Sequence, residues 1–163
     1  MRKYLTILFL SEILVYNCSA QKPAETIPNF IFYNLDNQPF TNNNLTSDKE
    51  TLFLFFDVTC DHCRKVIQSL NNRIDECKKL NVYLITLDDK PKIYAFLNMN
   101  AKNLLNYNNV TILQDLRDQF IKLFGPRKYP SVFLYSSDKK LLCYDDEDLY
   151  LDKFFKIINP SKK

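Results

Sequence analysis

Apolar residues form runs of strand length along this chain, separated by segments in which they recur every three or four positions. The near-continuous apolar runs are 51–57, 81–87 and 109–113. The segments with helical spacing are 60–80, the stretch that Pro91 opens, and 115–124. Continuous apolar runs are typical of strands buried on both faces, and helical spacing indicates amphipathic helices. The alternation therefore predicts an α/β protein with parallel strands connected by helices.

The two ends of the pattern complete this fold class. A short strand at 30–33 follows a polar lead-in at 21–29. Near the C-terminus, apolar runs at 131–136 and 140–144 are joined by only three residues, which predicts an antiparallel β-hairpin. A closing helix is expected over 149–158, and we interpret the acidic cluster 145–148 as its start, because acids there complement the helix dipole. The expected architecture is a mixed central sheet flanked by helices, with a C-terminal hairpin and closing helix.

Length and composition narrow the picture to one domain. The chain has 163 residues, of which 46% are hydrophobic, enough for one packed core over residues 21–163. The formal charge of +3 is small and dispersed, which excludes nucleic acid as an expected partner. The chain contains a single glycine, so its turns are expected to use Asn, Asp and Pro.

The first twenty residues resemble a targeting segment. Arg2 and Lys3 precede an apolar stretch that is short for a membrane span, and Cys18-Ser19-Ala20 supplies small residues before Gln21. Residues 1–20 are therefore predicted to be a signal peptide that exports the protein to the periplasm or cell envelope. Cys18 is either part of the discarded peptide or the lipidated first residue of a lipoprotein, and the sequence leaves both open. A membrane contact is expected only through this segment.

Cys60-Asp61-His62-Cys63 carries the chemistry of the chain. It lies between an apolar strand and the first turn of a helix. A thiol at a helix N-terminus meets unpaired backbone N–H groups, which favour its thiolate, and a second cysteine one turn later can close a disulfide with it. These residues predict a redox pair with Cys60 as nucleophile and Cys63 as resolving thiol. The other interpretation of the pair is a static disulfide.

This element order, with Cys-x-x-Cys opening the helix after the first central strand, resembles the thioredoxin-like superfamily. Residues 124–135, with Tyr129-Pro130 before an apolar strand, are similar to the family segment that carries a cis-proline. Residues 27–40 are similar to the lead-in of exported TlpA/ResA-like thiol:disulfide oxidoreductases. The resemblance implies a cis bond at Pro130 facing the cysteine pair, with Tyr129 presenting backbone groups to a substrate strand.

The chain departs from the thioredoxin pattern at three positions. Thr59 replaces the tryptophan before the first cysteine, Leu54 replaces a buried acid, and Asp61 replaces a proline. These departures count against a general thioredoxin-like reductase activity more than they count against the fold.

Two side chains between the cysteines are expected to tune the redox potential. His62, the only histidine, would stabilise a thiolate, as the resemblance to oxidising envelope enzymes implies. Asp61 works in the opposite direction and is also able to pair with His62. We favour a reductase of protein disulfides, although these opposing charges leave the direction of electron flow open. The expected partners are cysteine-containing protein substrates and a redox protein that recycles the pair, and no cofactor is expected.

Three other functions remain as alternatives. A metal or haem-assembly carrier would bind through Cys60, Cys63 and His62, although no resident metal is expected. A peroxiredoxin-like peroxidase would need a threonine three residues before its cysteine, where this chain has Asp57. A non-catalytic interaction module would keep the fold alone. The remaining cysteines, Cys77 and Cys143, are expected to be buried inert thiols, with a disulfide between them as the second interpretation.

Overall fold

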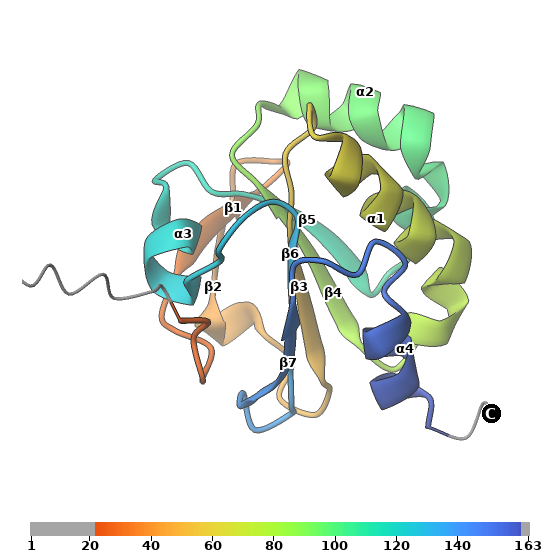
Figure 1. Ribbon diagram of the computed structural model, residues 1–163. Helices are drawn as coiled ribbons and strands as arrows, with labels where there is room; N and C mark the ends of the chain where they lie inside the picture. Colours follow the sequence, from red (N-terminus) through yellow and green to blue (C-terminus); the bar gives the residue numbers. More distant parts are fainter. Residues whose placement is uncertain (1–21, 161–163) are drawn as a thin grey trace, which may run out of the picture.

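A seven-stranded mixed sheet forms the centre of the molecule, with strand order β2-β1-β5-β4-β3-β6-β7 (Figure 1). The computed structural model describes residues 22–160. The predicted signal peptide at 1–20, with Cys18, lies outside the described residues. Within the described part of the chain, no helix has the length and apolar content needed to cross a membrane.

The three central strands are parallel, as their apolar runs predicted. They are β3 (Thr51–Phe55), β4 (Asn81–Thr86) and β5 (Val110–Gln114). Every residue of β3 and β4 is buried, which explains why these runs do not alternate between apolar and polar side chains. The carboxyl ends of the three strands meet at one edge of the sheet, and the cysteine motif follows directly from β3.

The predicted C-terminal hairpin is present. Strands β6 (Ser131–Tyr135) and β7 (Leu141–Asp145) are antiparallel, and β6 also pairs antiparallel with β3. In that pairing Ser131 lies opposite Phe55, the last residue of β3. Residues just before Ser131 and just after Phe55 therefore leave the sheet side by side. This register brings the Tyr129-Pro130 segment and the cysteine motif to the same end of two neighbouring strands.

A second hairpin completes the other side of the sheet. Strands β1 (Ile31–Asn34) and β2 (Pro39–Thr41) are antiparallel, and β1 joins the sheet through β5. Asn37 adopts a positive φ of 60° in the connecting turn, a conformation in which asparagine replaces glycine. The sequence predicted β1 but missed β2, which has only three residues.

Helices cover both faces of the sheet (Figure 1). The face that carries the cysteine motif is covered by α1 (Asp61–Arg73), α2 (Lys90–Asn100) and α4 (Asp152–Ile158). The shorter α3 (Gln119–Phe124) lies on the opposite face. Three 3-10 turns occur at Asn42–Asn44, Ile74–Cys77 and Lys102–Asn106. Gly125 ends α3 with a positive φ of 67°, a left-handed cap for which glycine lacks the steric penalty of a side chain.

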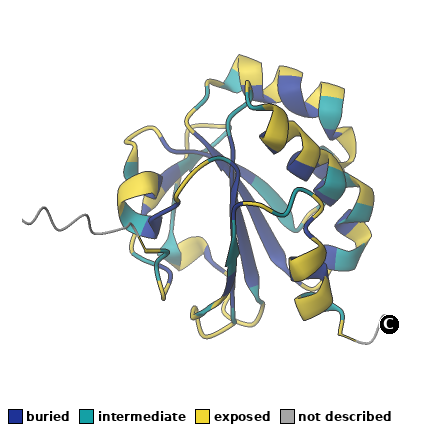
Figure 2. Ribbon diagram, viewed as in Figure 1, coloured by how far each residue is buried: buried dark blue, intermediate teal, exposed yellow. Residues whose placement is uncertain are grey.

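Side chains that alternate along the strands divide the core into two halves. The half under α1 and α2 is mainly aliphatic and includes Leu52 and Leu54 of β3. The half under α3 is mainly aromatic and includes Phe53 and Phe55 of the same strand. Both halves are closed to solvent, as the buried sheet in Figure 2 shows. Tyr129 packs against both halves and so lies at the seam between them.

The predicted helix start at 145–148 is wrong. Helix α4 begins at Asp152, and the first acid of the cluster is the last residue of β7. Three of the acids pair with basic residues: Asp145 with Lys153, Asp146 with Arg127, and Glu147 with Lys128. Only Asp148 resembles a helix cap, because its carboxylate accepts the backbone N–H of Lys153.

The helix expected over 115–124 is shorter than predicted. Its first residues form a turn in which the Asp115 carboxylate accepts the N–H groups of Arg117 and Phe120. Asp118 has a positive φ of 51°, which is incompatible with a helix interior. The helix therefore begins only at Gln119.

Candidate active site

Cys60 lies at the point where the chain enters α1. It is the N-cap residue of that helix, with extended backbone angles, and its Sγ accepts the backbone N–H of Cys63 at 3.2 Å. Its side chain is partly exposed and therefore accessible to a substrate. Cys60 therefore lies at a helix N-terminus, as the sequence predicted.

Cys63 lies one turn further along α1 and is fully buried. Its Sγ accepts the backbone N–H of Asp57 at 3.4 Å. Burial raises the pKa of the Cys63 thiol well above its ordinary value, and the hydrogen bond with Cys60 adds to the rise. The structure has no disulfide between the two sulfurs. The pair thus combines one accessible sulfur with one shielded sulfur.

The loop before Cys60 is held by Asp57. Its Oδ1 accepts the backbone N–H of Thr59 at 2.7 Å and the Thr59 hydroxyl at 2.6 Å. Its backbone carbonyl accepts the N–H of Cys60 at 3.2 Å. Asp57 therefore contacts both cysteines through its backbone while its side chain closes the loop between them and β3.

Asp88, just beyond β4, fixes the other side of this loop. Its Oδ2 accepts the backbone N–H of Val58 at 3.0 Å and the hydroxyl of the buried Thr86 at 2.7 Å. Sequence reasoning missed this residue. The signal was available, because the carboxyl ends of adjacent parallel strands meet, and Asp88 follows β4 as Asp57 follows β3.

The segment that precedes β6 approaches the same end of the sheet. The Tyr129–Pro130 peptide bond is cis, and Pro130 is buried. The ring of Tyr129 stacks on Phe55 with centroids 4.6 Å apart. Burial raises the pKa of Tyr129 to about 12, and the carboxylates of Asp57 and Asp88 contribute to that rise. The expected cis bond is present and the segment lies at the end of β3, whereas its facing of the cysteine pair stays a prediction.

The two residues between the cysteines are both exposed. Asp61 forms an ion pair with Arg64 at 2.7 Å, so the expected pairing of Asp61 with His62 is not what the structure has. Because Arg64 neutralises Asp61 at the surface, the opposing charge that this acid was expected to exert on the thiolate is reduced.

Two clefts are lined by residues of the segments around the cysteine motif. One, of about 350 Å³, is lined mainly by Val58, Thr59, Phe96 and Met99. The other, of about 300 Å³, lies on the Tyr129 side and includes Phe55, Ile121 and Arg127 in its walls.

The remaining predicted residues lie apart from this site. Cys77 ends the 3-10 turn after α1 and Cys143 lies on β7, and both are buried and reduced. Burial raises the pKa of Cys77 to about 12. Within residues 22–160 no three His, Cys, Asp or Glu side chains are arranged as a metal site.

Comparison with known proteins identifies the family. The model of the AhpC/TSA family matches residues 23–142, which include both the cysteine motif and the Tyr129-Pro130 segment. The chain belongs to the AhpC/TSA family. A search among curated proteins found no match.

Solved structures share the fold. Peroxidoxin BcpB from Mycobacterium tuberculosis is 16% identical, with a TM-score of 0.69 over 88% of this chain and 99% of that one. A thiol-disulfide oxidoreductase from Bacteroides fragilis is 20% identical, with a TM-score of 0.64 over 82% and 98%. An exposed lipoprotein thioredoxin from Streptococcus pneumoniae is 14% identical, with a TM-score of 0.62 over 81% and 98%. At these identities the likeness confirms the predicted thioredoxin-like fold.

Proposed function

We propose that this protein is a thiol:disulfide oxidoreductase of the cell envelope that reduces protein disulfides through Cys60 and Cys63. The observation that carries the proposal is the contrast between the two sulfurs. Cys60 is accessible and receives a backbone N–H at a helix N-terminus, whereas Cys63 is buried directly behind it. A donated N–H stabilises negative charge on sulfur, which is what a nucleophilic thiolate requires.

The exchange proceeds in two steps. The Cys60 thiolate attacks one sulfur of the substrate disulfide, forming a mixed disulfide and releasing the other substrate sulfur as a thiolate that takes up a proton. Cys63 then attacks the Cys60 sulfur as a thiolate, and the proton it gives up ends on the substrate sulfur that leaves. This second step forms the Cys60–Cys63 disulfide and releases the remaining substrate thiol. Two electrons pass from the protein to the substrate, and a redox partner returns them in the next cycle.

Tyr129 and Pro130 supply the substrate platform in this proposal. The register of β3 and β6 brings their backbone beside the end of β3, from which the cysteine loop departs. An extended substrate segment would pair with the Tyr129 backbone and present its disulfide to Cys60. His62, exposed beside Cys60, is proposed to favour the thiolate, and Asp61, paired with Arg64, to oppose it only weakly.

The likeness to peroxidoxin BcpB raises a peroxidase as the second candidate function, and position 57 argues against it. Position 57, where a peroxidase is expected to carry threonine, holds an aspartate. Its carboxylate is already occupied by the N–H and hydroxyl of Thr59. No hydroxyl is therefore supplied at that position for a peroxide.

A trapping experiment tests the proposed chemistry. The variant Cys63→Ser lacks the resolving thiol, so a mixed disulfide between Cys60 and glutathione should accumulate to near one equivalent after addition of glutathione disulfide. Mass spectrometry of the purified protein measures the adduct and its site. Wild-type protein should instead carry the Cys60–Cys63 disulfide, and Cys60→Ser should form neither product.

The same material tests the proposed location. When the full-length chain is expressed in a bacterial host, the mass of the mature protein from the envelope fraction should show an N-terminus at Gln21 or a lipidated Cys18. An unprocessed chain that stays in the cytoplasm would contradict export.

In the trapping experiment, a glutathione adduct that forms equally well in Cys60→Ser would contradict the assignment of Cys60 as the nucleophile.

A further inference from the structure

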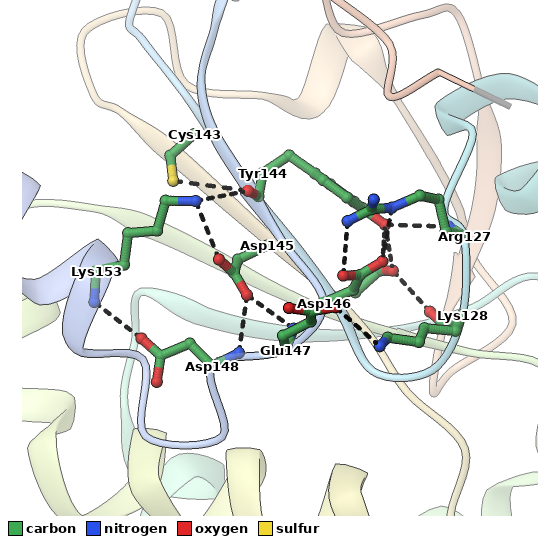
Figure 3. A network of polar contacts seen from close by, with 10 residues as sticks. Arg127, Lys128, Cys143, Tyr144, Asp145, Asp146, Glu147, Asp148 and Lys153 are labelled. Carbon is green, nitrogen blue, oxygen red and sulfur yellow. Dashed lines mark hydrogen bonds and ion pairs between the residues drawn. The ribbon is translucent and has the colours of Figure 1, made fainter. Parts of the chain in front are cut away.

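A buried carboxylate lies next to the segment that carries Tyr129 and Pro130. The side chain of Asp146 is only 2% exposed, and it accepts two parallel hydrogen bonds from Arg127, from Nε at 2.9 Å and from Nη2 at 2.8 Å. The hydroxyl of Tyr144 donates a third, also at 2.9 Å. Figure 3 shows these groups converging between β7 and the loop before β6. A buried charge with this many partners holds its surroundings in one arrangement.

The Tyr144 hydroxyl links this carboxylate to the loop backbone. It accepts the backbone N–H of Arg127 at 3.0 Å and lies 3.0 Å from the hydroxyl of Ser131. The Ser131 hydroxyl in turn donates to the carbonyl of Lys128 at 2.6 Å. We name Arg127, Ser131, Tyr144 and Asp146 the Tyr144 network. Its members hold the chain on both sides of Tyr129-Pro130.

The network does not contact the sulfurs directly. Ser131 begins β6 and Tyr144 lies in β7, so the network anchors the loop to these two strands of the sheet. Tyr129 itself is held by its stacking on Phe55. The Tyr129 segment is thus held by the network through its neighbours and by Phe55 through its ring, which is a pre-organised arrangement for strand pairing.

We propose that Tyr144 is a positioning residue for substrate capture, because its hydroxyl fixes the backbone that pairs with the substrate segment. This inference rests on the proposed function, in which the Tyr129 backbone holds the substrate. Tyr144 acts through residues 127–131 and not on the reacting sulfurs. Its loss should therefore affect substrates that have a peptide backbone and spare those that do not.

Two coloured disulfides separate these effects. One is dithionitrobenzoate, which has no peptide backbone. The other is an extended peptide whose single cysteine carries thionitrobenzoate as a mixed disulfide. In both, Cys60 forms the new disulfide and thionitrobenzoate leaves as the thiolate, so one absorbance measures both reactions. The peptide alone is able to pair with the Tyr129 backbone.

Tyr144→Phe removes the hydroxyl that donates to Asp146 and accepts the N–H of Arg127, and it should lower the second-order rate with the peptide roughly three- to tenfold. Its rate with dithionitrobenzoate and the redox potential of the Cys60–Cys63 pair should equal those of wild type. Ser131→Ala, which removes the bond to the Lys128 carbonyl, should show the same selective loss. Tyr135→Phe is the matched control, because its buried hydroxyl donates to the Ala24 carbonyl at 3.0 Å, at the far end of β6.

The outcomes are distinct. A selective loss in Tyr144→Phe with an unchanged Tyr135→Phe control supports the positioning role. An equal loss with both disulfides, or no loss with either, would overturn it while leaving the proposed function intact. Wild-type protein that reacts with neither disulfide through Cys60 would overturn the proposed function and the positioning role together.

Discussion

Accessibility and charge separate the two cysteines at the scale of single residues. Cys60 is partly exposed, whereas Cys63 is fully buried and its thiol has a raised pKa. A thiol with a raised pKa stays protonated at neutral pH and is a poor nucleophile. The order of attack in the proposed mechanism follows from this burial: the exposed sulfur would meet the substrate, and the buried sulfur would react only with its neighbour.

Alkylation of the reduced protein measures this difference. At pH 7 we expect iodoacetamide to label Cys60 at least tenfold faster than Cys63, Cys77 or Cys143, since burial raises the pKa of each of these three thiols. Peptide mass spectrometry at timed intervals gives the four rates. In denaturant the four rates should converge. Labelling of Cys63 at the rate of Cys60 in folded protein would contradict the assigned roles.

At the scale of elements, the site depends on where the strands end. Asp57 follows β3, Asp88 follows β4, and Ser131 begins β6 beside Phe55. Each of these polar residues holds the backbone of a loop that borders the sulfurs. The sheet thus fixes the active-site loops through the residues just beyond its regular part.

Thr86→Val tests how strongly β4 supports the cysteine loop. The variant keeps the shape of the side chain but removes the hydroxyl that donates to Asp88 at 2.7 Å. Asp88 retains the N–H of Val58, so we expect a loss of about 1–2 kcal/mol in the free energy of unfolding. Urea denaturation measures it. Thr111→Val, at a half-buried position of β5, is the control and should change stability by less than about 0.5 kcal/mol.

The elements that could be predicted from the sequence are those that a local pattern of apolar residues marks. The runs in β3 and β4 were identified because strands buried on both faces need continuous apolar residues. Asp146 was misassigned because its partner, Arg127, is nineteen residues away and on another element. Asp88 was missed for the same reason, since its role depends on the loop after a neighbouring strand. Polar contacts of long range leave no periodic signal in the chain.

At the scale of the whole molecule, buried thiols connect the redox state to stability. Burial raises the pKa of Cys77 from 9.0 to about 12, and it raises that of Cys63 in the same direction. The folded state therefore keeps these thiols protonated at a pH where the unfolded chain ionises them. Their favourable contribution is complete below pH 9.0 and is lost as the pH rises toward 12.

The free energy of unfolding of the reduced protein should therefore decrease as the pH rises. Between pH 8 and pH 10 we expect its stability to fall by roughly 1 kcal/mol for each buried thiol that titrates. The oxidised protein, in which Cys63 no longer ionises, should lose less over the same interval. Urea titrations of both forms at each pH provide the comparison, with Cys77→Ala as a control that removes one titrating group. Equal losses in the two forms would contradict the assignment to Cys63.

The single glycine has a consequence for redesign of the chain. Gly125 holds a left-handed cap immediately before the segment that binds substrate in the proposed function, whereas Asn37, Asp118 and Lys139 adopt similar angles with a side chain in place. A side chain in that region carries a steric penalty of about 1–2 kcal/mol. An engineer who seeks a sturdier variant would place glycine at an exposed position such as Lys139 and leave Gly125 untouched. Among the positions with a positive φ named here, the one that holds the chain's only glycine is thus the least open to replacement.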